Sequence, residues 1–189
     1  MPSTPLTEDE YVRTIESLRG RRVVGVAYYP MACGVDGTEV EDWDFGDWHL
    51  PTLGVELLVD DGTRYSASWD QSFDHYGLEV FREPMSSQLG LIGQPDGSPE
   101  VLVTGHAAWA GLVGAPLTGA EILWSEGDCG RRMPVAVTLS TEFSAVWLVA
   151  GRPARWPADG QFCLGTDDVM VVFTRALASS IGLGSVTLP

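Results

Sequence analysis

The sequence predicts an α+β fold that is mainly β, in which an antiparallel sheet forms a partly open barrel or a sandwich, with a short helix near each terminus. Three observations support this prediction. Apolar and polar residues alternate along several short runs, most clearly over 54–69. Glycine and proline separate these runs, and the strands are not joined by regular helices, which argues against a doubly wound α/β fold. Helical periodicity is confined to segments near the two termini.

The chain of 189 residues is expected to form a single globular domain over 1–189, because no stretch resembles a linker. Its apolar fraction of 44% is typical of a folded protein. We expect a cytoplasmic location, since there is no signal-peptide pattern and no run of eighteen apolar residues. Three cysteines without CxxC spacing fit reduced thiols.

The first predicted element is a helix over 8–19. Thr7 occupies its N-cap position and Glu10 follows three residues later, which is a capping-box pattern. A strand over Val23–Tyr29 comes next, as its β-branched and aromatic residues indicate. Residues 31–53 show no regular period, so they form either a functional loop or a segment with a short strand that the pattern does not reveal.

The clearest element is a β-hairpin over 54–69, closed by Asp60, Asp61 and Gly62. Shorter alternating runs predict further strands, of which 134–139 and 144–150 form a second hairpin. Thr174 caps a last helix, and Gly182 ends it. These later predicted strands and helix cover residues 78–81, 101–105, 120–125, 134–139, 144–150, 169–173 and 175–181.

Negative charge is concentrated in one part of the chain. The formal net charge is −15, and between Val23 and Thr63 there are nine carboxylates and no lysine or arginine. Such a field repels nucleic-acid phosphates and anionic lipid, and it attracts cations or a basic protein. We therefore expect neither nucleic acid nor membrane as a partner. The alternative is that the acidity only keeps the protein soluble.

The segment from Asp36 to His49 is the main candidate for a binding site, because it interleaves aromatic and acidic residues. Aromatic anchors surrounded by charge are typical of surfaces that bind another protein. We expect this segment to engage a basic partner protein. The alternative is that its aromatic residues fold inward and close one end of the sheet. The expected partner-binding residues are Asp42, Trp43, Asp44, Phe45, Asp47 and Trp48.

The same segment also suggests a cation site, with Asp42, Asp44, Asp47 and His49 as ligands. The spacing is not that of an EF-hand loop. The alternative function is accordingly a small-ligand-binding barrel or a metal-dependent enzyme that uses these four residues. No cofactor other than such a divalent cation is expected.

Patterns typical of catalysis are otherwise missing from the sequence, so we expect a non-catalytic protein. There is no GxSxG elbow, P-loop or dinucleotide fingerprint. Glu56, Glu79 and Glu121 lie on predicted strands, where they could pair as acids in a barrel mouth. Alternation along those strands predicts instead that the three glutamates face solvent.

The order of several features resembles an uncharacterised bacterial family of small acidic β-rich proteins. The resemblance is carried by the hairpin over 54–69, by tryptophans at Trp109 and Trp124, and by the motif Gly-x-Asp-Asp-Val-x-Val-x-Phe at 165–173. It implies a shared fold and no activity. Some domains of this kind are similar to immunity proteins that neutralise toxins.

Overall fold

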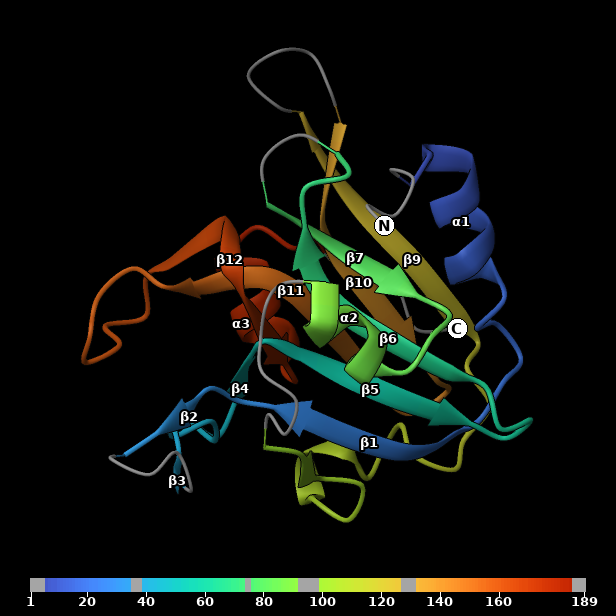
Figure 1. Ribbon diagram of the computed structural model, residues 1–189, viewed down its shortest axis with the longest axis horizontal. Coiled ribbons are helices and arrows are strands. Elements are labelled where there is room, and N and C mark those ends of the chain that lie inside the picture. The colour runs from blue at the N-terminus through green and yellow to red at the C-terminus, as the bar shows by residue number, and fades with distance from the viewer. Residues whose placement is uncertain (1–5, 35–38, 74–75, 92–98, 127–131, 185–189) are drawn as a thin grey trace.

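The computed structural model describes residues 6–34, 39–73, 76–91, 99–126 and 132–184, and it consists of two five-stranded sheets packed face to face (Figure 1). The strands of each sheet pair antiparallel. The predicted α+β fold that is mainly β is therefore confirmed, as a sandwich and not a closed barrel. In strand order, the first sheet is β7 (Gly77–Phe81), β6 (Arg64–Asp70), β5 (Gly54–Val59), β1 (Val23–Tyr29) and β8 (Val101–Leu102). The second is β4 (Trp48–Thr52), β12 (Phe162–Val172), β11 (Ala145–Pro153), β10 (Arg132–Ser140) and β9 (Gly119–Glu126).

Smaller elements surround the two sheets. A two-stranded ribbon, β2 (Ala32–Cys33) and β3 (Glu39–Val40), extends from the end of β1. The helices in the described ranges are α1 (Glu8–Glu16), α2 (Met85–Leu91) and α3 (Arg175–Ser180), together with a 3₁₀ turn, η1 (Ala107–Trp109). No helix in the described ranges is both long enough and apolar enough to cross a bilayer.

The main core lies between the sheets because each central strand turns alternate residues inward. Val55 and Leu57 of β5, for example, face the same core as Leu148 of β11 and Val171 of β12. Trp109 of η1 is fully buried at one end of this core. A second apolar cluster on the other face of the second sheet contains Trp48 and Trp147 together with residues of α3.

Most predicted elements occur close to their expected bounds. The capping box at Thr7 is present, with its hydroxyl accepting the Glu10 N–H at 3.3 Å. Both predicted hairpins form, as β5–β6 and β10–β11. Several elements were not predicted from the sequence: β2, β3 and β4, which lie within the irregular segment 31–53, and also α2 and η1.

Two glutamates that were expected to face solvent are buried, which corrects that expectation. Glu56 and Glu79 are 3% and 0% exposed, whereas Glu121 is exposed as predicted. Alternation does direct them away from the inter-sheet core, but other segments cover this face of the sheet. A Glu56 carboxylate oxygen accepts the Met85 N–H at the start of α2 (2.8 Å), and Glu79 accepts the Ser72 N–H (3.0 Å).

The chain crosses from the second sheet to the first through a strained turn between β4 and β5. The Leu53 N–H donates to the Pro51 carbonyl at 2.7 Å, so Thr52 is the central residue of a three-residue turn. Its φ of +53° is unusual for a β-branched residue. Such strain persists only where the surrounding structure enforces it, and it is often found at functional sites.

Candidate functional site

The acidic segment after β3 contributes to two features: a cleft on one side and a cluster of polar side chains on the other. Asp42 and Phe45 line a cleft toward the loop that joins β11 to β12. Trp43 and Asp44 instead contact two histidines, His49 and His106, on the side of β1 and η1. The same short segment therefore forms one wall of the cleft and the surface part of a polar cluster. Asp36, where the expected segment begins, lies outside the described residues.

The remaining predicted partner-binding residues are placed very differently from one another. Asp47 is exposed, and its carbonyl accepts the Phe173 N–H at 3.0 Å. Trp48 is only 7% exposed, because its ring packs in the second apolar cluster, with the Phe162 centroid 5.3 Å away. Trp48 therefore offers little surface to a partner. It instead supports neighbouring residues that are more accessible.

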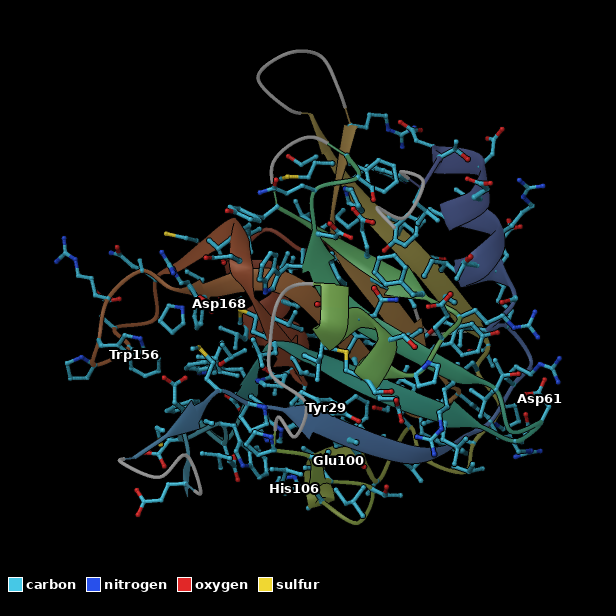
Figure 2. All side chains as sticks on the ribbon, in the orientation of Figure 1. Tyr29, Asp61, Glu100, His106, Trp156 and Asp168 are labelled. Carbon is cyan, nitrogen blue, oxygen red and sulfur yellow. The ribbon has the colours of Figure 1, made fainter. Side chains whose placement is uncertain are left out.

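The cleft encloses about 590 Å³ between the acidic segment and the loop after β11. Aromatic and charged side chains line it together, and Figure 2 shows two of them, Trp156 and Asp168, on the same side of the molecule. Its charged and aromatic lining residues are Glu41, Asp42, Phe45, Arg152, Arg155, Trp156 and Asp168. Thr52, the strained residue, lies in its wall as well.

The aromatic wall of the cleft consists of Phe45 and Trp156. Phe45 stacks on Trp48, with ring centroids 4.3 Å apart and planes inclined by 13°. Trp156 is tilted against Phe45 at 5.3 Å and is 58% exposed. A large aromatic ring left mostly in water beside a second ring is a surface suited to binding a partner.

A bulge in β12 brings the carboxylate of Asp168 to the cleft. Gly151 pairs with Leu164 and Ala150 with Val169, so residues 165–168 loop out of the ladder. Within this bulge Asp168 lies 3.3 Å from the Arg152 guanidinium, and burial raises the pKa of its carboxyl while Arg152 opposes that shift. The bulge contains the Gly-x-Asp-Asp part of the motif noted in the sequence.

The polar cluster is centred on Asp44. One carboxylate oxygen is 3.2 Å from His49 Nε2 and the other is 3.2 Å from His106 Nε2. The Gly46 N–H donates to Asp44 at 3.0 Å and is the main reason that the pKa of this carboxyl is lowered. Asp44 and His49 belong to the predicted set of metal ligands, whereas Asp42 and Asp47 of that set are not in the cluster found among the described residues.

His49 is completely buried, and two further buried groups fix its ring. Its Nδ1 lies 2.7 Å from the Tyr28 hydroxyl, which accepts the Trp109 indole N–H at 2.9 Å. Burial lowers the pKa of His49 to about 4, although the nearby Asp44 carboxylate opposes the shift. The imidazole is therefore neutral at pH 7, and one of its two ring nitrogens has a free lone pair.

Comparison of the chain with protein-family models, curated proteins and solved structures finds no match. The function proposed for it therefore depends on the geometry of the cleft and of the polar cluster. The resemblance noted for residues 165–173 stays an expectation about the fold.

Several site residues were not identified from the sequence because they come from distant parts of the chain. Arg152, Trp156 and Asp168 reach the cleft only through the pairing of β11 with β12. His106 lies 62 residues from Asp44 and joins the cluster through η1. The sequence feature that could have indicated the cleft is the proline-rich stretch around Trp156, which combines charged residues with an aromatic one.

Proposed function

We propose that the protein is a non-catalytic binding protein that takes a cationic side chain of a basic partner protein into the cleft between Asp42, Phe45 and Trp156. The observation that supports this most strongly is the exposed Trp156 ring in the same cleft as the exposed carboxylates of Glu41 and Asp42. A guanidinium or ammonium group over an aromatic face is attracted by the ring quadrupole, and Arg in particular stacks on such faces.

The cleft is lined by three carboxylates, those of Glu41, Asp42 and Asp168, and by two guanidinium groups, those of Arg152 and Arg155, so the carboxylates outnumber the cations and favour a cationic ligand. Arg152 is neutralised in part by Asp167 and Asp168, at 3.5 and 3.3 Å. Glu41 and Asp42 add negative charge to the same cleft, in a chain whose formal net charge is −15. The long-range field would steer a basic protein toward the molecule, and the cleft would then select its orientation.

As part of the same proposal, we place the protein in the reducing environment of the cytoplasm. Cys33 and Cys163 both carry free thiols, and Cys163 is exposed. An exposed free thiol is typical of proteins from reducing compartments.

The experiment is a calorimetric titration with three short peptides of equal length, containing paired arginines, paired lysines or paired glutamates. We expect the arginine peptide to bind most tightly, the glutamate peptide not to bind, and the affinity to fall as salt is raised. Trp156→Ala should weaken arginine-peptide binding about tenfold, since a partly desolvated cation–π contact contributes about 1–2 kcal/mol.

Matched variants identify the site. Phe143→Ala removes another exposed aromatic ring, 74% exposed, and should bind like the parent protein. Asp42→Asn should weaken binding, while Asp47→Asn, which removes the same charge from the same segment, should weaken it less. Equal affinities for Trp156→Ala and Phe143→Ala, or equal binding of the arginine and glutamate peptides, would contradict the proposal.

The volume of the cleft favours a second candidate function, which is the binding of a small cationic molecule. A cleft of about 590 Å³ is within the range of small-ligand sites. Free arginine and agmatine serve as probes in the same titration. Binding of agmatine as tight as that of the arginine peptide would assign the cleft to a small ligand, because the peptide backbone would then contribute nothing.

A further inference from the structure

Separate from the cleft, Asp44, His49 and His106 bring nitrogen and oxygen atoms close together beside Trp43. Their ligand atoms all lie within 4.8 Å of one another. Two imidazoles and one carboxylate are a donor set that suits zinc and neighbouring divalent transition metals, and not calcium or magnesium, which prefer oxygen ligands. We propose that these three residues bind a divalent transition metal ion of the zinc class.

The spacing of the ligand atoms fits such an ion. Tetrahedral bonds of about 2.0–2.1 Å place neighbouring ligand atoms about 3.3–3.4 Å apart. The two contacts of Asp44, to His49 Nε2 and to His106 Nε2, are both 3.2 Å. These contacts use different carboxylate oxygens of Asp44, and the three ligand atoms lie within 4.8 Å of one another, so the side chains would close around a bound ion.

The second and independent observation is the state of His49 Nε2. His49 is 0% exposed, and this nitrogen makes no hydrogen bond within the described part of the chain, although Asp44 is near it. A buried polar atom without a partner is costly, and each such atom in a folded protein needs an explanation. Coordination of a metal ion would satisfy the nitrogen.

The groups behind His49 are arranged as in metal sites. A coordinating histidine usually donates its other ring N–H to a fixed acceptor, which sets the tautomer and the orientation of the ring. Here Nδ1 lies 2.7 Å from the Tyr28 hydroxyl oxygen, and Trp109 holds that oxygen with an N–H donor at 2.9 Å. With the proton on Nδ1, the lone pair of Nε2 points to the cluster.

His106 must exchange one bond for another when an ion binds. Its Nδ1 accepts the Ala108 N–H at 3.2 Å, as the N-cap of η1, so its Nε2 carries the proton that faces Asp44. Coordination through Nε2 moves this proton to Nδ1 and breaks the cap. The affinity will accordingly be lower than that of a site in which all second ring nitrogens already donate.

One coordination position remains for water or for an atom of another molecule. The side chains of Asp44 and His106 are 45% and 31% exposed, so the cluster opens to solvent on their side. Three protein ligands with an open position are the arrangement of accessible zinc sites, in contrast to the closed four-ligand structural sites.

The test uses tag-free, chelator-treated full-length protein and Zn²⁺, Co²⁺ and Ca²⁺ as separate probes. We expect one equivalent of Zn²⁺ to bind by calorimetry and to raise the melting temperature, since it binds only the native state. Co²⁺ should give the visible absorption of a low-symmetry site with nitrogen ligands. Ca²⁺ should produce neither effect.

Two ligand variants and two controls make the result specific. Asp44→Asn should weaken Zn²⁺ binding at least tenfold, whereas Asp47→Asn, with the same loss of charge three residues away, should bind like the parent. His106→Asn also removes a ligand but keeps a favoured N-cap residue for η1, so a fold defect is avoided. Trp156→Ala should bind Zn²⁺ normally, which separates this site from the cleft.

Zn²⁺ binding that is absent, or that is the same in Asp44→Asn, His106→Asn and Asp47→Asn, would overturn the proposal. Ca²⁺ binding that Asp47→Asn abolishes would overturn it as well, because the acidic segment and not the histidine cluster would then be the cation site.

Discussion

Phe45 stacks on Trp48, with the two ring centroids 4.3 Å apart and the ring planes inclined by 13°. Trp48 belongs to β4 and is buried in the second apolar cluster, while Phe45 precedes the strand and faces the cleft. The stack therefore connects an irregular segment to the core and holds one wall of the proposed binding cleft in place.

Phe45→Ala should destabilise the protein and also weaken arginine-peptide binding. Loss of the stack removes an aromatic pair and part of the apolar surface that it buries, so we expect the free energy of unfolding to fall by about 1–2 kcal/mol. Urea denaturation measures this. Phe143→Ala, at a 74% exposed ring, should change stability by less than about 0.5 kcal/mol. Similar losses in the two variants would show that the stack contributes no stability.

Gly54→Ala should be strongly destabilising, because an added Cβ has no room. That atom would lie 2.5 Å from the Ala67 carbonyl oxygen and 2.3 Å from the Met85 side chain. Overpacking of this kind costs about 1–3 kcal/mol, which a thermal melt detects. Gly105→Ala is the control, since nothing lies within 4 Å of its added Cβ. Melting of both variants at the temperature of the parent protein would contradict a steric clash at Gly54.

Glu79 should make stability depend on pH. Burial raises its pKa in the folded state to about 7, with Asp70 adding to the shift and Ser72 opposing it. The folded protein therefore keeps the proton up to a higher pH than the unfolded chain, whose pKa is near the usual 4.5. The resulting contribution to stability is complete below about pH 4.5 and is lost as pH rises through 7.

Glu79→Gln removes this dependence. The parent protein should lose about 2–3 kcal/mol of unfolding free energy relative to the variant between pH 5 and pH 8. This magnitude follows because each unit of pKa shift corresponds to about 1.4 kcal/mol. Urea denaturation at four pH values measures the difference, in which contributions from the other carboxylates cancel. A difference that stays constant across this range would mean that Glu79 titrates normally.

Tyr28 and Trp109 should behave as coupled residues. Tyr28→Phe leaves both the Trp109 indole N–H and His49 Nδ1 buried without their partner, so we expect a loss of about 2–4 kcal/mol in unfolding free energy. Trp109→Phe should lower the cost of Tyr28→Phe by about 1 kcal/mol, because one of those groups is then gone. Strictly additive losses in the double-mutant cycle would contradict the connected network.

The parts of the fold that the sequence predicted are those that short-range patterns determine. The β5–β6 hairpin has alternation in both arms and a glycine at φ +84° in its turn, at Gly62. The β4 strand shows no alternation, because all five of its residues are buried, and it pairs with β12 far along the chain. Among the described residues, no side chain close in sequence caps the start of α2; the carboxylate of Glu56, from a distant strand, accepts its first N–H.

The candidate site was predictable only where its residues are neighbours in sequence. The sequence itself shows that Asp44 and His49 are close along the chain, and it shows the series of aromatic residues that includes Phe45. Which side chain faces the cleft, the core or the histidines depends on packing against distant strands. That packing buries Trp48, which was expected to contact a partner, and brings in His106, which was not among the predicted metal ligands.

The most direct measurement for the proposed cleft is an NMR titration of the tryptophan indole N–H signals with the arginine peptide. Trp156 is assigned by Trp156→Phe and the other indoles by the same approach. The proposal predicts that the Trp156 signal shifts most, that Trp48 beneath the cleft wall shifts less, and that the buried Trp109 and Trp147 do not move. An unchanged Trp156 signal in the presence of bound peptide would place the binding surface elsewhere and contradict the account.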